Sequence, residues 1–519
     1  MLTIIGYLIG FLLVFLLHRN DWSKGLFRVT RKTTWIVSGL SLLMFSYSAT
    51  LGHFAYGIIQ DTGIWGMWMV WVGLIGSGIV PFVFAPLWQS FNLETDNQFI
   101  LVRFSGRGAS ILQIFRAILI GMIIVPMIVS MQLLAFAHIL EAAAGLSGNL
   151  SILLSGAILA VFALKNTFQL KLAHDAYHFV LYVAGLIILF VSFLEISGGL
   201  EQSLDYFRTV RPEALALIPS ADDQVFWNSF LVLFGIQWWS AQLTDGGGPE
   251  MARFTATKSR WDVVKAAALP VVLTIGIDLL FIAMILMSLA SGGGQGEQGW
   301  VESVFRAVPS QSSPFILLVF FILFLTSAES FLNWGSSLLT VDVYKSRLNP
   351  ELSIPGRNRV GIGLMVLMSI VSTVLALGSE SIIFVVSLFL SISTGVAPVL
   401  LLRWFWMRIN AWSQLSAMLA SLVYTVLLYA LEASGHPIFD WLPFKPHETR
   451  IVIVTVLTTL TWLTVTFLTP STNPNLTAQF KEALPPRKRV LKDFGVALLF
   501  GLGITAVLFL GLMLLVGRG

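Results

Sequence analysis

Oxygen-bearing side chains occur at helical spacing in the segment Thr326-Ser327-Ala328-Glu329-Ser330. Thr326 and Ser330 are four residues apart and Glu329 lies three after Thr326, so a helix places all three on one side. Hydroxyl and carboxylate oxygens suit a small, hard cation. Hydroxyls in helices also commonly bond to their own backbone. Glu329 favours the cation site, because a carboxylate within a membrane helix needs a cation or a proton.

Two further acids lie in apolar surroundings. Asp175, in His174-Asp175-Ala176-Tyr177-His178, could coordinate a cation or reach water at a membrane surface. Asp278, in Gly276-Ile277-Asp278, could bind a substrate, relay a proton or pair with a buried partner.

The histidines beside Asp175 allow an enzymatic alternative. His174 and His178 have the spacing of a zinc-binding H-E-x-x-H helix, with Asp in place of Glu, as in a membrane metalloprotease. Asp is a shorter general base than Glu, and the five other histidines include no evident third ligand. This hypothesis is therefore the weaker one.

Two segments have the composition of interrupted membrane helices. Small polar residues stand next to Gly52, namely Ser46, Tyr47, Ser48 and Thr50. A break there would expose backbone carbonyls to a cation, although close packing of small residues explains the composition equally well. A second apolar run stops at Trp238-Trp239 and gives way to Thr244-Asp245-Gly246-Gly247-Gly248-Pro249, which also indicates a discontinuous helix.

These residues must lie on helices that cross a membrane. Apolar residues are 56% of the 519 and charged residues only 11%, whereas a soluble domain has about 25% charged residues. A bilayer core of about 30 Å needs roughly 20 apolar residues per helix, and such stretches recur along the whole chain. The net charge of +4 is not a nucleic-acid signature, and with no cysteine there is no thiolate site.

We predict fourteen helices in one membrane domain. Their extents are 2–17, 34–58, 65–88, 112–143, 149–164, 172–197, 224–242, 264–290, 314–342, 360–378, 380–404, 411–432, 449–469 and 493–516. The first stretch has no basic residues before it and no cleavage site after it, so we interpret it as a retained helix rather than a signal peptide. The long loops 198–223 and 291–313 are rich in Gly, Ser and acids, which is typical of solvated caps.

The basic residues set the predicted orientation. With both termini outside, 25 of the 31 Lys and Arg residues fall in inside loops. This agrees with the positive-inside rule. Lys171, Arg253 and Arg403 are among the residues assigned to these loops.

Together the segments resemble the sodium:solute symporter family, which includes the sodium/glucose, proline and sialate transporters. The resemblance spans nearly the whole chain through Thr95-Asp96, Arg103-Phe104-Ser105-Gly106, Phe115-Arg116-Ala117, Ile236-Gln237-Trp238-Trp239-Ser240, Gly246-Gly247-Gly248, Met251-Ala252-Arg253, Thr326 to Gly335, Asp342-Val343-Tyr344-Lys345 and Arg403 to Trp412. It implies an all-α, LeuT-type membrane fold of two inverted five-helix repeats. The repeat core would cover about 34–404, with flanking helices at 2–17 and about 411–516.

The resemblance also implies the site residues. A first sodium site would use the carbonyls of Met44, Tyr47 and Leu323 and the hydroxyls of Thr326 and Ser327. A second site, for a cation or a proton, would use Asp175, Thr326, Glu329 and Ser330. Two carboxylates at one site are stable together only with a cation or proton between them, so the resemblance also implies that Asp175 and Glu329 are energetically coupled. The chain lacks the Gly-Gly pair that the family usually carries in its fifth helix and has Glu329 where sialate-type members have Ser, so sodium and proton both stay open for the second ion.

The implied function is sodium-coupled import of a small organic solute by alternating access, without enzymatic activity. We expect the solute to contact Thr50, His53, Gln237, Trp238 and Asp278. The expected partners are sodium, the solute and the lipid bilayer, with no nucleic acid and no cofactor besides the coupling ion. The location would be the cell membrane, as a multi-pass protein of a bacterial inner membrane. A non-transporting solute sensor of the same fold is a further alternative, and the sequence leaves solute identity and oligomeric state open.

Overall fold

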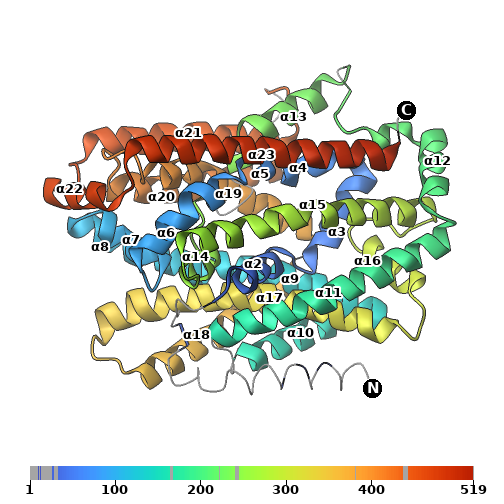
Figure 1. Cartoon of the computed structure of the whole chain (residues 1–519), viewed down its shortest axis with the longest axis horizontal. Helices are drawn as coiled ribbons and strands as arrows, with labels where there is room; N and C mark the ends of the chain where they lie inside the picture. The colour runs from blue at the N-terminus through green and yellow to red at the C-terminus, as the bar shows by residue number, and fades with distance from the viewer. Residues whose placement is uncertain are drawn as a thin grey trace.

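The computed structural model describes residues 7, 10, 12, 26–27, 33–163, 168–220, 222–239, 245–379, 381–435 and 442–517. The described residues form helices joined by short connections (Figure 1). The long helices run along the long axis of the molecule, and several short helices gather at its two ends. Apart from three positions, the helix expected at 2–17 lies outside the described residues.

The five predicted spans from 34–58 to 172–197 correspond to the first half of the core. Its elements are α2 (Trp35–Ser46), α3 (Thr50–Thr62), η2 (Ile64–Met67), α4 (Trp68–Trp71), α5 (Gly73–Gly76), η3 (Val80–Phe84), α6 (Ala85–Phe91), η4 (Asp96–Gln98), α7 (Phe99–Arg103), α8 (Gly106–Leu119), η5 (Ile120–Ile124), α9 (Val125–Ala144), α10 (Gly148–Ala163) and α11 (Phe168–Ser197).

The second half and the flanking helices follow in the same order. The elements of the second half are α12 (Leu200–Val210), η6 (Pro212–Leu215), α13 (Gln224–Gly235), η7 (Gln237–Trp239), α14 (Pro249–Thr255), α15 (Arg260–Ala290), α16 (Gly299–Ala307), α17 (Ser313–Ser337), η8 (Leu338–Leu348), α18 (Ile354–Leu377) and α19 (Ile382–Leu402). The flanking helices are α20 (Ala411–Ala433), α21 (Pro446–Leu468), α22 (Pro474–Ala483) and α23 (Arg487–Val516).

Among the described residues, nine helices are long and apolar enough to cross a membrane, and a bent pair, α2 with α3, brings the number to ten. The expected spans 65–88, 149–164 and 224–242 are made of shorter helices. In the first of these, the helix changes from π to α winding near Pro81 and Pro86. Proline lacks a backbone N–H donor, so the regular hydrogen-bond pattern cannot continue through it. The structure therefore supports a multi-pass membrane protein without establishing a count of fourteen.

The first helix of the core, expected at 34–58, is broken where the sequence indicates a break. The axes of α2 and α3 meet at 52°, and Tyr47 between them is extended, with φ −89° and ψ 117°. The Ser48 hydroxyl lies 2.5 Å from the Thr50 hydroxyl and accepts a hydrogen bond from the Thr50 backbone N–H at 3.4 Å. Such local bonds compete with the helix, and the last carbonyls of α2 are left without helical partners.

The sixth helix of the core, which is the first span of the second half, is interrupted as the break in α2 and α3 interrupts the first. Helix α13 ends at Gly235, and the short turn η7 holds Gln237, Trp238 and Trp239. Helix α14 begins at Pro249, after Gly248 with φ +71°. Proline suits the first turn of a helix, and glycine adopts the positive φ before it at no steric cost.

The packing of the two halves follows the pattern of an internal repeat. Helix α2 contacts α15, and α14 contacts α6, so the first helix of each half lies against the second helix of the other. Likewise α9 contacts α18 and α17 contacts α10, which pairs the third helix of each half with the fourth of the other. The two interrupted helices thus occupy equivalent positions.

The loop 291–313 is not the solvated cap expected from its composition. It contains α16, whose Trp300 is fully buried and lies beside the rings of Tyr56, Phe193 and Phe281. Gly52 allows this close approach, because a Cβ there would meet the Trp300 indole nitrogen at 2.2 Å. The apolar residues of α16 recur on one face, so the segment folds onto the core despite its Gly and Ser content.

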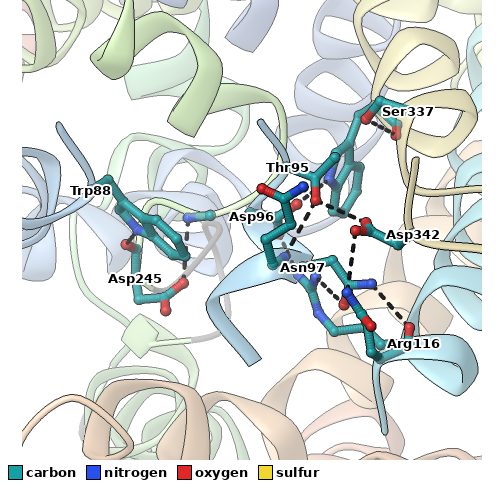
Figure 2. Close-up of polar contacts among 12 residues, drawn as sticks. Trp88, Thr95, Asp96, Asn97, Arg116, Asp245, Ser337 and Asp342 are labelled. Carbon is teal, nitrogen blue, oxygen red and sulfur yellow. Dashed lines mark hydrogen bonds and ion pairs between the residues drawn. The ribbon is translucent and has the colours of Figure 1, made fainter. Parts of the chain in front are cut away.

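A buried polar network connects the loop before α7 to the core, at the face predicted to be cytoplasmic. Figure 2 shows Thr95, Asp96, Asn97, Arg116 and Asp342 gathered there, with Trp88 and Asp245 in a neighbouring cluster. Asp96 pairs with Arg116 and accepts a hydrogen bond of 2.9 Å from Trp334. Thr95 donates to Asp342 at 2.8 Å. Burial raises the pKa of Asp96, but the charge of Arg116 and the hydrogen bonds from Arg116, Trp334 and the Gly248 backbone together outweigh burial, so the pKa lies below its usual value.

Replacing Arg116 by Ala should destabilise the protein by roughly 3–5 kcal/mol, because Asp96 would stay buried without its cation. The loss should be largest where Asp96 of the variant is ionised and should shrink as the pH falls. Without Arg116, burial raises the pKa of Asp96, so the variant first relieves the cost by taking up a proton. Below about pH 4 the wild type also loses stability, because its folded-state pKa is depressed and its stabilising charge is lost on protonation. Thermal unfolding in detergent measures both effects. Arg107→Ala, at an exposed position of the same helix, is the control, and equal stability of the two variants would contradict the role of the pair.

Candidate functional site

A cluster of buried charges lies beside the broken first helix. Lys171 and Asp175 are four residues apart on α11, and Lys171 Nζ is 3.1 Å from Asp175 Oδ1. Ser41 of α2 donates to Asp175 Oδ2 at 2.5 Å, and Arg253 of α14 lies 3.5 Å from the same oxygen. Arg253 Nε also donates to the Ser41 hydroxyl at 2.8 Å. Lys171 is 3% exposed and Arg253 1%, so these charges interact largely shielded from water.

The predicted ligands of helix α17 complete this cluster. Lys171 Nζ donates to the Thr326 carbonyl at 2.8 Å and lies 3.9 Å from Glu329 Oε2. The Ser330 hydroxyl accepts a bond of 2.9 Å from Arg253 and donates to the Thr326 carbonyl at 2.8 Å. The four residues predicted for a second ion site, Asp175, Thr326, Glu329 and Ser330, are thus brought together around two basic side chains.

The placement of these basic residues corrects the sequence analysis. Lys171, Arg253 and Arg403 were assigned to inside loops, yet Lys171 lies in α11 and Arg253 in α14, and all three are buried and ion-paired. Arg103 and Arg116 are buried as well. One signal for Lys171 was present, because its spacing from Asp175 is that of an i,i+4 pair on one helix face. The partner of Arg253 comes from a distant segment, which no local spacing reveals.

The ligands predicted for the first ion site lie where α2 and α17 pack together. The Ser327 hydroxyl donates to the Phe45 carbonyl at the end of α2, at 3.2 Å, and accepts a bond of 3.1 Å from Gln132 of α9. Met44 and Leu323 are buried in the same core. The Thr326 hydroxyl lies 3.1 Å from Nδ1 of His178 on α11. The oxygens that Ser327 and the end of α2 bring together are therefore those of a hydroxyl and a carbonyl, which carry no formal charge.

Asp278 lies at the break of the first helix. Its carboxylate accepts hydrogen bonds from the Tyr47 hydroxyl at 3.1 Å and from Nε1 of Trp71 at 3.0 Å. The Tyr182 ring lies 5.8 Å from the Tyr47 ring. Three roles were considered for Asp278, namely binding a solute, relaying a proton and pairing with a buried partner. The contacts with Tyr47 and Trp71 are of the third kind.

The other predicted solute residues have two different surroundings. His53 Nδ1 lies 3.0 Å from the Ala49 carbonyl and its ring is 5.7 Å from that of His138, while Thr50 bonds to Ser48 in the break. Both therefore belong to the first broken helix and its contact with α9.

Gln237 and Trp238 belong to the second broken helix. Gln237 donates to the Met69 carbonyl at 2.5 Å and lies 3.2 Å from His447 Nε2 on α21. The half-buried Trp238 ring covers Gly76 of α5, where a Cβ would lie 2.9 Å from the ring.

A narrow cavity reaches the charged cluster from the predicted cytoplasmic side. It has a volume of ≈ 30 Å³ and is lined among others by Lys171, Arg253, Ser330, Asp96 and Trp334. One water needs roughly 10–15 Å³ of such space, so the cavity holds about two waters. It connects the charged cluster to the network around Asp96.

The geometry gives no support to the metalloprotease hypothesis. Within the part of the chain that the structure describes, no group of three His, Asp or Glu side chains could hold a metal ion. Asp175 is in contact with Lys171, Arg253 and Ser41, and His178 with Thr326 and Tyr7. The carboxylate that would serve as general base is therefore occupied by ion pairs and a hydrogen bond from Ser41.

Comparisons with known proteins agree with this geometry. The model of the sodium:solute symporter family matches residues 27–421. The sodium/pantothenate symporter of Escherichia coli (strain K12) is 25% identical over 196 residues, which are 37% of this chain and 38% of that protein. The structure of a Na+-coupled sialic acid symporter, substrate-bound and outward-open, superposes with a TM-score of 0.68 at 17% identity, covering 91% of this chain and 98% of that one. The fold is therefore LeuT-type, with interrupted first and sixth helices.

Proposed function

Since the chain belongs to the sodium:solute symporter family, we propose that it imports a small organic solute together with sodium by alternating access. The observation that carries this proposal is the broken first helix, whose free carbonyl end meets Ser327 of α17. Helix C-termini carry partial negative charge, so a cation is stabilised there. Sodium would bind the carbonyls of Met44, Tyr47 and Leu323 and the hydroxyls of Thr326 and Ser327.

The proposed site can couple ion to solute because one break serves both. Tyr47 offers its carbonyl to sodium and its hydroxyl to Asp278, and Thr50 and His53 follow on α3. If sodium stabilises one arrangement of α2 and α3, it also stabilises the solute surface that begins at Tyr47, and linkage makes the effect reciprocal. The solute would lie between the two breaks, in contact with Gln237 and Trp238 on the other side.

The chain would lie in a bacterial inner membrane with both termini outside, as the distribution of basic residues favours. In this orientation the cavity beside Lys171 faces the cytoplasm, and the loop carrying Asp96 lies at the cytoplasmic mouth of the ion path.

Replacing Thr326 and Ser327 together by Ala should raise the sodium concentration for half-maximal uptake roughly tenfold or more, because two of about five ligands are lost and each tenfold change is about 1.4 kcal/mol. Uptake in proteoliposomes at varied sodium concentration measures this. Ser337→Ala is the matched control, since its hydroxyl lies on the same helix and bonds to the Trp334 carbonyl. A double variant with the sodium dependence of the wild type would place the ion elsewhere.

Replacing Trp238 by Ala should weaken solute affinity about tenfold while sodium binding in the absence of solute is retained, because a stacking surface is removed without touching an ion ligand. A thermal-shift screen of solutes with and without sodium first identifies the solute, and titration of the variant then gives the affinity. Trp261→Ala, at an exposed position, is the control. Unchanged solute affinity would remove Trp238 from the site, and loss of both ligands would indicate a folding defect.

A further inference from the structure

Each of the four residues predicted for the second ion site contacts a positive charge that belongs to the chain itself. Lys171 Nζ reaches the Thr326 carbonyl at 2.8 Å, Asp175 at 3.1 Å and Glu329 at 3.9 Å. An ammonium group has three donors and no acceptor, so it takes the oxygens that would otherwise surround a free cation. The fourth residue, Ser330, accepts a bond of 2.9 Å from Arg253.

The charges of the ion pairs in this cluster balance. Glu250, which also interacts with Arg253, has a pKa raised by burial to about 8, so its carboxyl is largely neutral at pH 7. The carboxylates of Asp175 and Glu329 contribute two negative charges, and Lys171 and Arg253 two positive ones. All four side chains are buried. A sodium ion added here would leave an uncompensated positive charge in the interior, which is costly. It would also compete with an ammonium group that is already tethered to α11 and has no translational freedom to lose.

Among the described residues, the hydroxyls proposed as ligands of the first ion site are not in contact with Lys171. Lys171 reaches the carbonyl of Thr326, whereas the Thr326 hydroxyl, which is the proposed ligand, lies 3.1 Å from Nδ1 of His178. Ser327 contacts the Phe45 carbonyl and the neutral amide of Gln132. Free carbonyls at the end of α2 add partial negative charge. A mobile cation is therefore favoured at the first site and disfavoured at the second.

We propose that Lys171, together with Arg253, is the permanent cation of the second ion site, so that a single sodium ion, bound at the break of the first helix, accompanies each solute. This rests on the sodium-coupled function proposed above. Lys171 acts through its fixed charge, and it also connects α11 to the Thr326 carbonyl of α17. Removing that charge should create a second sodium site, because the carboxylates of Asp175 and Glu329 would lose the positive charge that contacts both of them.

The test is the number of sodium ions bound per purified full-length chain, measured with radioactive sodium at saturation. We expect one for the wild type, one for Lys171→Arg, and two for Lys171→Met. The double variant Lys171→Met with Asp175→Asn restores the charge balance and should return to one. Lys265→Met, at an exposed position, is the control and should bind one.

The outcomes separate this inference from the proposed function. No sodium bound by the wild type overturns both. Two ions bound by the wild type overturn only the inference, and this count needs no variant to fold. One ion bound by both the wild type and a folded Lys171→Met chain also overturns it. If the single variant does not fold, two ions bound by the charge-balanced double variant overturn it as well, while one ion supports it.

Discussion

Four buried charges, those of Asp175, Glu329, Lys171 and Arg253, connect the interrupted sixth helix to α11 and α17. They come from α11, α17 and α14, and Ser41 adds α2 to the same network. Removing either basic group would leave one buried negative charge of the cluster uncompensated, at a cost of several kcal/mol. The two interrupted helices therefore stay packed against their neighbours. Ser41 holds α2 against α11, and Arg253 holds α14 against α11 and α17.

The same principle recurs toward the predicted cytoplasmic face. Asp245, just before α14, accepts bonds from Arg403 at 2.6 Å and from Trp404 at 2.9 Å, beyond the end of α19. Its carbonyl accepts a bond of 2.6 Å from Trp88 of α6 (Figure 2). These contacts join segments of both halves, as the pair of Asp96 and Arg116 joins a loop to α8. Apolar packing gives little preference between helices in lipid, so such polar contacts specify which helices meet.

The sequence was a good guide to the fold because hydropathy and charge report directly on the membrane environment. The break at Tyr47 and the interruption after Trp239 followed from local composition, and the structure has both near those places. Burial of α16 was missed, since its Gly and Ser content hid an apolar face that depends on Trp300. Lys171 was counted as a loop residue because its partners on α17 lie about 155 positions away in the chain. Long-range pairing of charges is decided by three-dimensional packing, and a single sequence does not record it.

The two proposed ion positions differ in the charge of their ligands. This difference explains why the transported ion should be the one held by neutral oxygens. A cation that leaves two buried carboxylates exposes their charges to a dry interior, and that penalty opposes release. A cation that leaves carbonyls and hydroxyls exposes only dipoles, which cost far less and which a few waters can satisfy. Transport requires release as much as binding. A site near Ser327 and the end of α2 meets both needs, whereas the carboxylate pair of Asp175 and Glu329 is better suited to a cation that never departs, and Lys171 is such a cation.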